Sequence, residues 1–215
     1  MLKRRGFTLI ELLIVIAIIL ILIAIALPNF LEAQLRARIT KARGDMRTIS
    51  IAFESYFIDF GNYPDDNDSD DYSESGIYQL TTPIQYLTAI PIDPFVPENS
   101  SFSNQGDEYG WEITTTGGSA LIAHLHPTER DSNVHAYVIT SHGVDTDDDF
   151  SCGSGDWPFC GRSLSACPGS GYRNYAPTNG SKSDGDLTLP GGEYRSGRYC
   201  VDSTLIVGRY PKHIP

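Results

Sequence analysis

Positive charge is scarce in this chain of 215 residues, which has 16 Lys and Arg against 27 Asp and Glu and a formal net charge of −11. Proteins that bind nucleic acid broadly need Lys and Arg to contact phosphate, so we expect no nucleic-acid binding. A second long apolar run is also missing, which excludes a multi-pass membrane protein. The sequence contains no P-loop, no nucleotide fingerprint and no motif for a nucleophile and its base, so we expect no enzyme.

One apolar segment stands at the N-terminus. Of the 21 residues from Phe7 to Leu27, 19 are apolar, whereas residues 28–215 are polar and acidic. As a helix this segment could cross a bilayer core of roughly 30 Å, with the basic flank Lys3–Arg5 in the cytoplasm. A cleaved secretory signal is the alternative, but its apolar core would be shorter and a small-x-small site would follow it.

Glu11 lies inside this apolar segment. A carboxylate in a membrane helix costs several kcal/mol unless it is paired, so a simple anchor does not explain it. If apolar helices packed together in a filament, the buried carboxylate would need a cation. Glu11 is therefore a candidate functional residue.

A short basic leader precedes the letters GFTLIE at residues 6–11, and Pro28 lies within the long helix that follows. These residues resemble the processing and methylation site of type IV pilins and of the pseudopilins of type II secretion. The resemblance implies that a prepilin peptidase cuts between Gly6 and Phe7 and methylates the new amino group. It also implies that Glu11 pairs with the Phe7 amino group of a neighbouring subunit. The cut would remove three basic residues, so the mature chain would have 13 basic and 27 acidic residues and a formal net charge of −14.

An amphipathic pattern follows Pro28. Its apolar residues recur at spacings of three and four: Leu35, Ile39, Ala42, Met46, Ile49, Phe53, Tyr56 and Phe60. The pattern predicts a helix that ends at Gly61-Asn62, and a helix over residues 7–60 would be roughly 80 Å long. Pro28 should kink or loosen it. A coiled-coil seam is the alternative to packing on a sheet.

Basic residues occupy the other face of this helix, between Arg36 and Arg47. They could bind lipid headgroups or nucleic acid, form a solvated face, or neutralise acidic residues on the next subunit.

The remaining sequence predicts loops and short strands. Residues 61–76 form an acidic loop that is solvated or, alternatively, binds calcium. A short helical or turn segment over residues 77–87 follows, and then an extended, stiff turn at Ile90–Phe95, where prolines flank Asp93. This turn resembles the loop between helix and sheet in major pseudopilins. The expected strands are Trp111–Thr115, Ala120–Leu125, Ala136–Thr140 and Leu205–Val207, of which the first three should form an antiparallel meander over the helix.

A run of carboxylates follows the third of these strands, at Asp145, Asp147, Asp148 and Asp149. Four like charges this close repel one another unless a cation lies among them. The run is not an EF-hand, because Phe150 stands where that loop needs glycine. Ser141, Gly143 and Asp145 resemble the start of the calcium loop of major pseudopilins, which implies a structural calcium ion. A solvated acidic turn is the alternative.

The other candidate metal and covalent sites are weaker. A zinc site would draw on the histidines, but no suitably spaced thiol or carboxylate accompanies His124, His126, His135 and His142. In an exported domain, four cysteines suggest two disulfides with three possible connectivities. We favour Cys152–Cys160 and Cys167–Cys200. Residues 174–187 resemble a tail of some pseudopilin-like proteins.

These features predict an α+β fold, and the resemblance implies that it is of the pilin-like type. A long N-terminal α-helix, transmembrane in its first half, would pack on a small antiparallel β-sheet with long irregular C-terminal loops. The expected parts are a leader at 1–6, a transmembrane or filament-core helix at 7–28, an amphipathic helix at 29–62 and a globular domain at 63–215.

The resemblance implies a structural subunit of a helical pseudopilus for type II protein secretion. Its partners would be further copies of itself, minor pseudopilins, the prepilin peptidase, the inner-membrane assembly platform and, before assembly, the membrane. The globular domain would lie in the periplasm of a bacterium, anchored by a single pass of the inner membrane, and the filament would be periplasmic or extracellular. The alternatives are a type IV pilin for adhesion, motility or DNA uptake, and a membrane-tethered calcium-binding module that does not polymerise.

Overall fold

A computed structural model describes eight stretches of the chain: 7–67, 76–96, 109–115, 135–146, 174–180, 183–192, 198–201 and 204–207. Several predictions fall outside the described residues: the leader at 1–6, the strand Ala120–Leu125, and the sites at His124, His126, Asp147, Asp148, Asp149, Cys152, Cys160 and Cys167. The chain forms two compact units, Met1–Ala37 and Arg38–Pro215.

Helix α1 spans Leu9–Phe60 without interruption, and Pro28 lies inside it. In the first unit its large apolar side chains are exposed all around the helix. By length and composition this stretch could cross a membrane, and none of it is buried within the protein. Exposure of so many apolar side chains is unfavourable in water and normal in lipid or in a helix bundle. Among the described residues, the first unit is therefore a helix without a buried face.

In the second unit, α1 buries one face. The buried residues are Ile39, Ala42, Met46, Ile49, Ala52 and Phe53, which confirms the predicted stripe over this range. The stripe ends earlier than predicted, because the side chain of Phe60 is 46% exposed. The helix ends where expected: Gly61 adopts a left-handed φ of 74°, and its N–H donates to the Phe57 carbonyl at 2.8 Å.

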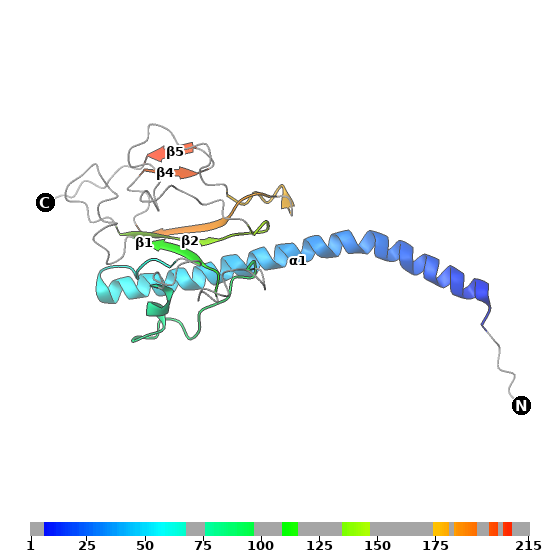
Figure 1. Ribbon diagram of the computed structural model, residues 1–215, viewed down its shortest axis with the longest axis horizontal. Helices are drawn as coiled ribbons and strands as arrows, with labels where there is room; N and C mark the ends of the chain where they lie inside the picture. The colour runs from blue at the N-terminus through cyan, green and yellow to red at the C-terminus, as the bar shows by residue number, and fades with distance from the viewer. Residues whose placement is uncertain are drawn as a thin grey trace, which may run out of the picture. The chain divides into compact units, whose positions relative to one another are not determined.

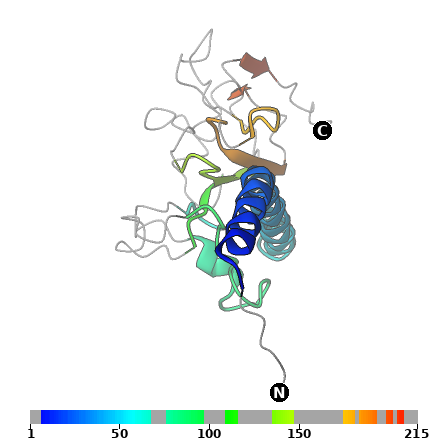
Figure 2. The ribbon, with the colours of Figure 1, turned by 90° about the vertical axis from the view of Figure 1, so that its right-hand side faces the viewer.

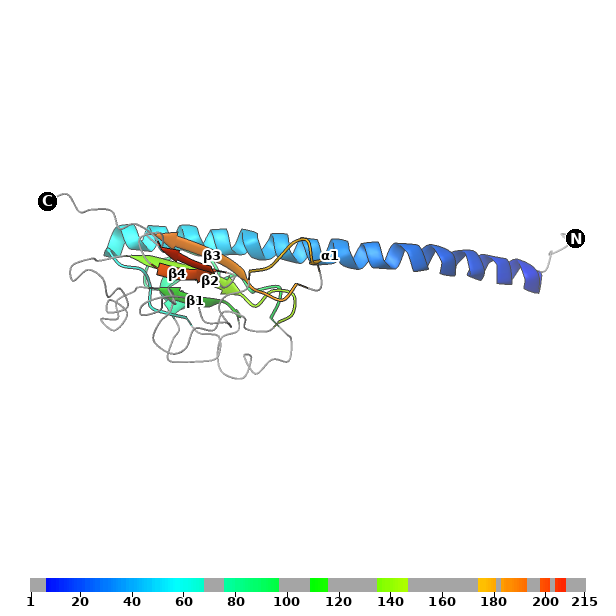
Figure 3. The same ribbon diagram turned by 90° about the horizontal axis from the view of Figure 1, so that it is seen from above.

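Three short strands cover that face of α1: β1 (Glu112–Thr115), β2 (Ala136–Ser141) and β3 (Leu187–Gly192). They form an antiparallel sheet in the order β1-β2-β3, beside the cyan part of α1 (Figure 1; Figure 2). The central strand β2 is buried along its whole length. Seen from above, the strands run next to one another over the helix (Figure 3). The 3₁₀-helix η1 (Gly76–Leu80) follows the acidic loop, and β4 (Arg198–Val201) pairs with β5 (Thr204–Val207) in a separate antiparallel ribbon.

Strand β3 was not predicted from the sequence, because it contains Pro190-Gly191-Gly192, residues that usually indicate a turn. In the described sheet β3 is an edge strand, where a proline does not remove a ladder hydrogen bond to a further strand. Gly191 lies opposite Tyr137 in the register between β2 and β3. A Cβ at Gly191 would come within 2.0 Å of the Tyr137 ring, so that ring occupies the space that a side chain would fill.

The ring of Tyr137 anchors the sheet to α1. Its hydroxyl lies 2.7 Å from the Ser50 hydroxyl and donates to the Glu54 carboxylate at 3.0 Å. The Tyr63 hydroxyl donates to the same carboxylate at 3.2 Å. The rings of Tyr137 and Phe53 pack with their centroids 4.9 Å apart. Burial raises the pKa of Tyr137 above its usual range, so its hydroxyl stays protonated and remains a donor at physiological pH.

Candidate functional site

The first candidate site is the N-terminal turn of α1. The carboxylate oxygen Oε2 of Glu11 accepts two hydrogen bonds from Thr8, one from the backbone N–H at 2.9 Å and one from the hydroxyl at 2.7 Å. The Thr8 hydroxyl oxygen in turn accepts from the Glu11 N–H at 3.3 Å. Thr8 and Glu11 have the spacing of a capping box, which satisfies donors that an isolated helix end leaves open.

This geometry gives Glu11 a partner within its own chain. Hydrogen bonds to a carboxylate reduce the cost of placing it in an apolar medium, although they do not supply a positive charge. The predicted partner, the amino group of Phe7 on a neighbouring subunit, would supply that charge. Glu11 therefore has a local set of donors before any subunit contact, and Thr8 is a positioning residue that its T-x-x-E spacing could have identified from the sequence.

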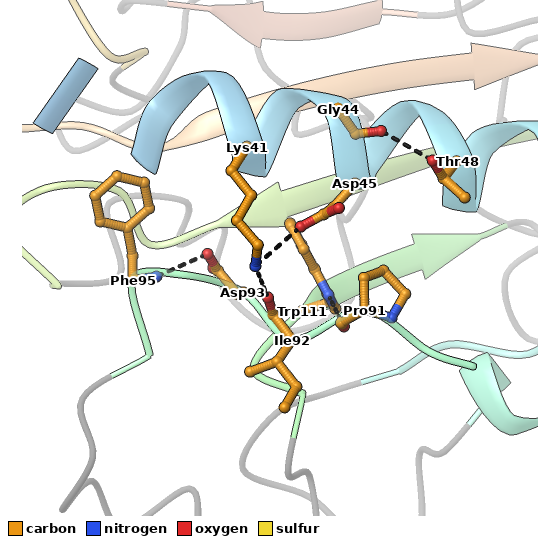
Figure 4. Close-up of polar contacts among 9 residues, drawn as sticks. All are labelled: Lys41, Gly44, Asp45, Thr48, Pro91, Ile92, Asp93, Phe95 and Trp111. Carbon is orange, nitrogen blue, oxygen red and sulfur yellow. Dashed lines mark hydrogen bonds and ion pairs between the residues drawn. The ribbon is translucent and has the colours of Figure 1, made fainter. Parts of the chain in front are cut away.

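The second feature is the turn at Ile90–Phe95, which Figure 4 shows beside α1 and Trp111. The Trp111 indole N–H donates to the Pro91 carbonyl at 2.7 Å, and the Lys41 ammonium donates to the Ile92 carbonyl at 3.3 Å. The Lys41 ammonium also lies 3.4 Å from a carboxylate oxygen of Asp45, one helical turn away. This turn therefore connects the helix to the start of β1, as expected for a stiff segment that joins helix to sheet.

Asp93 lies at the centre of this turn and is only 2% exposed. Its carboxylate oxygen Oδ1 accepts the Phe95 N–H at 3.0 Å, and its own N–H donates to the Tyr109 carbonyl at 2.8 Å. Burial raises the pKa of Asp93 to about 6; Ser141, the Phe95 N–H and Lys41 oppose this shift, and Asp45 adds to it. The sequence indicated a turn here but not the burial, because the groups around Asp93 come from distant parts of the chain.

The raised pKa of Asp93 makes stability depend on pH. The folded chain holds this proton up to about pH 6, whereas an unfolded aspartate loses it near 3.8, so stability falls as pH rises through this window. The difference corresponds to roughly 3 kcal/mol at neutral pH. Asp93→Asn keeps an oxygen to accept the Phe95 N–H and cannot ionise. We expect this variant to be more stable than the parent at pH 7, and the gap should close towards pH 4, as measured by urea unfolding across pH.

An exposed aspartate provides the control for this measurement. Asp65→Asn makes the same chemical change at an exposed position. Its free energy of unfolding should therefore change between pH 4 and pH 7 by as much as that of the parent. Equal pH profiles for the parent and Asp93→Asn would show that the ionisation of Asp93 costs nothing in the folded chain.

The third feature is the loop after β2. The Ser141 hydroxyl oxygen accepts the Gly143 N–H at 3.4 Å, and Gly143 adopts a left-handed φ of 70°. A Cβ at Gly143 would lie 2.8 Å from the Gly185 carbonyl oxygen, so only glycine permits this approach. The Asp145 carboxylate accepts the Gly185 N–H at 3.0 Å. All three residues that resemble the pseudopilin loop therefore take part in one turn against residues 183–186.

The structure also explains the segment 174–187, for which the sequence offered only a resemblance. The Tyr175 N–H donates to the Asp186 carbonyl at 2.9 Å, and the Ala176 N–H donates to the Ser183 hydroxyl at 2.8 Å. The segment thus folds back on itself before β3 and presents Gly185 to Asp145.

Of the four predicted calcium ligands, only Asp145 lies in the described part of the chain, and its side chain is exposed. The described residues include no group of three or more His, Cys, Asp or Glu that could hold a metal ion. An exposed carboxylate on an ordered turn is nevertheless a suitable oxygen donor for calcium. Of the histidines considered for zinc, His135 packs edge-on against the ring of Phe57, and His142 is buried in the turn after β2. The fourth cysteine, Cys200, lies on β4.

Comparison with known proteins agrees with the sequence motif. Residues 1–27 match the family model described as the prokaryotic N-terminal methylation motif. The chain is 46% identical over 120 residues to the type IV major pilin protein PilA of Myxococcus xanthus, which covers 56% of this chain and 41% of that pilin. No solved structure matches the chain significantly.

Core proteins of type II secretion systems match along more of their own length. Core protein G of Pseudomonas aeruginosa is 31% identical over 101 residues, covering 43% of this chain and 69% of that protein. Core protein G of Escherichia coli is 28% identical over 123 residues, covering 54% of this chain and 82% of that protein. The chain has the methylation motif, a long apolar helix and a small antiparallel sheet, and it is similar in sequence to these proteins. It therefore belongs to the family of type IV pilins and type II secretion pseudopilins.

Proposed function

We propose that this protein is the structural subunit of a helical pseudopilus in a type II secretion system. The observation that carries the proposal is the first unit of α1, an exposed apolar helix that starts with a hydrogen-bonded carboxylate. Such a helix suits two environments in turn, the bilayer and the core of a helix bundle. We expect the subunit to leave the membrane and to pack this helix against other copies, and the proposal assigns it no catalytic activity.

Processing would precede assembly. The prepilin peptidase would cut between Gly6 and Phe7, and the new amino group would pair with Glu11 of another copy. Pro28 would allow the helix to loosen locally as the subunit moves out of the bilayer. The expected partners are other copies, minor pseudopilins and the inner-membrane assembly platform, and the globular unit would be periplasmic.

A direct test is electron microscopy of cells that express the chain together with its own secretion genes. The proposal expects fibres that carry the protein and that disappear when the assembly ATPase gene is deleted. A protein that stays in the membrane fraction as single copies, with all assembly genes present, would instead be the membrane-tethered module.

A type IV pilin is the second candidate, and the 46% identity to the Myxococcus pilin favours it. The greater share of core protein G that the chain covers favours the pseudopilin, as does the resemblance of its two loops to that group. The neighbouring genes should separate the two functions. A retraction ATPase gene beside this one would favour a pilin, and a secretion ATPase with a secretin would favour a pseudopilin.

We also propose that calcium stabilises the loop after β2. Asp145 would contribute one carboxylate, and Asp147, Asp148 and Asp149 would contribute others. The bound ion would offset their repulsion and would hold the turn against Gly185. Its chemistry here is structural.

Removal of calcium should therefore lower the melting temperature of the full chain in detergent. A ligand present at 100 times its Kd stabilises the folded state by about 2.7 kcal/mol, so a chelator should lower the melting temperature by several degrees. With or without calcium, Asp147→Asn/Asp149→Asn should melt at the temperature that the parent shows in the chelator. The control Asp59→Asn, at an exposed position near the end of α1, should respond to calcium like the parent. An unchanged melting curve in the chelator would exclude the calcium site.

A further inference from the structure

Charge is segregated along this chain. Residues 48–129 contain fourteen Asp and Glu and neither Lys nor Arg, whereas residues 38–47 contain four basic residues and one acid, Asp45. In a homopolymer every copy would bring the same excess of negative charge to its neighbours, and like charges repel at close range. Contacts between copies therefore need a positive surface.

Such a surface lies on α1. Arg43, Arg47, Ile51 and Ile58, which we call the outer stripe, follow one another at spacings of four, four and seven, so they share one side of the helix. All four side chains are exposed; Ile51 is 69% exposed and Ile58 is 81% exposed. The outer stripe points away from the buried face that Met46 and Phe53 form against the sheet.

The arginines of the outer stripe lack partners within the described part of the chain. Lys41, on another side of the helix, pairs with Asp45 at 3.4 Å. No ion pair or hydrogen bond joins the guanidinium groups of Arg43 and Arg47 to any residue that the structure describes. Two isoleucines further along the same side leave apolar area in water. Charged groups beside exposed apolar ones are typical of an interface with a polar rim.

We propose that the outer stripe docks on the acidic region of a second copy, with Asp59 and Asp65 among its contacts. This proposal rests on the proposed filament and names the surface that sets its register. Both carboxylate side chains are exposed, at the end of α1 and just after it. Copies that leave one membrane lie parallel. If one copy is shifted along the helix axis by 12 residues, its Arg47 lies beside Asp59 of the other copy; a shift of 16 residues brings Arg43 there instead. These shifts correspond to a stagger of roughly 18 to 24 Å at 1.5 Å per residue.

A membrane surface fits the outer stripe less well than a second copy does. Anionic headgroups would neutralise Arg43 and Arg47. Ile58, however, lies 15 residues beyond Arg43, or roughly 22 Å along the helix, whereas a headgroup layer is only about 5 to 8 Å thick. A protein surface that carries both acids and apolar side chains can cover the whole length of the outer stripe.

A charge-swap series tests the contact in cells with the complete assembly machinery. We expect R43E/R47E to reduce filament yield at least tenfold and the charge-conserving R43K/R47K to stay near the parent. R43E/R47E/D59K/D65K has the net charge of the parent and should recover most of the yield, because each copy then offers reversed charges to its neighbour. Thermal unfolding in detergent shows which variants fold.

Photo-crosslinking keeps the test valid if a charge variant does not fold. A photoreactive phenylalanine at Ile51 of the otherwise unchanged chain should give adducts between copies, with the second site inside residues 48–96. Adducts with lipid or with another protein would overturn the proposal, and so would normal filaments from folded R43E/R47E or no recovery in the folded swap variant. If the parent itself forms no filaments, the proposed function fails and this contact fails with it. Parental filaments with any of the other contrary results refute the contact alone.

Discussion

Cells that produce Glu11→Ala should contain the protein in the membrane but should form no fibres. The substitution removes the one charged group inside the apolar stretch, so insertion into the bilayer becomes easier. Assembly should fail because the amino group of a neighbouring subunit loses its anionic partner, and breaking a buried ion pair costs about 3–5 kcal/mol at each contact. Membrane fractionation and electron microscopy of the same cells measure the two effects.

Two matched variants separate the charge of Glu11 from its hydrogen bonds to Thr8. Glu11→Gln keeps an oxygen that can accept the Thr8 N–H and hydroxyl, but it has no charge. Thr8→Val keeps the charge and removes the hydroxyl that donates at 2.7 Å. If pairing between subunits is what matters, Glu11→Gln should fail like Glu11→Ala, and Thr8→Val should form fibres at a reduced rate. Normal fibres from Glu11→Gln would contradict the ion pair.

A single methyl group should have opposite effects at two glycines of the second unit. At Gly191 a Cβ would come within 2.0 Å of the Tyr137 ring, which is held by Phe53 and by hydrogen bonds to Ser50 and Glu54. Moving the ring would break those contacts, so Gly191→Ala should destabilise the protein by about 1–3 kcal/mol. At Gly44, on the exposed side of α1, a Cβ would have no neighbour within 4 Å. Gly44→Ala should stabilise the helix by about 0.5–1 kcal/mol.

Thermal unfolding of the full chain in detergent measures both changes, and each variant is the control for the other because the chemical change is the same. Tyr137→Phe/Gly191→Ala provides a further check. Without its hydroxyl the ring has fewer contacts to lose, so the added cost of Gly191→Ala should be smaller in that background. A destabilisation that stays the same would show that the methyl group acts on the strand backbone and not on the ring.

Periodicity was enough to predict the parts of the fold that depend on local pattern. The stripe from Ile39 to Phe53, the glycine that ends α1 and the position of β2 are all properties of consecutive residues. Strand β3 escaped prediction because its identity as a strand depends on β2 beside it and on the Tyr137 ring above Gly191. Turn-forming residues can occupy a strand when the tertiary structure uses the space and freedom that they provide.

The candidate sites divide in a similar way. Glu11 was apparent from the sequence, since a lone carboxylate among apolar residues is unusual in any helix. The burial of Asp93 was not, because it arises where Lys41, Ser141 and Phe95 meet around one side chain. The turn that Ser141, Gly143 and Asp145 form likewise depends on Gly185, which is 40 residues further along the chain than Asp145. Long-range contacts of this kind leave little trace in a single sequence.

The hydrogen bond between Asp145 and Gly185 has an evolutionary consequence. It brings together two points that are 40 residues apart in the chain, one just after β2 and one just before β3. The entropy of closing a loop grows slowly with its length, by about 0.6 kcal/mol for each doubling. Relatives could therefore lengthen or shorten the chain between residues 150 and 173 at little cost to the fold, and a peptide tag inserted there should be tolerated. The surface of the globular unit can then differ between relatives while the helix that builds the fibre stays the same.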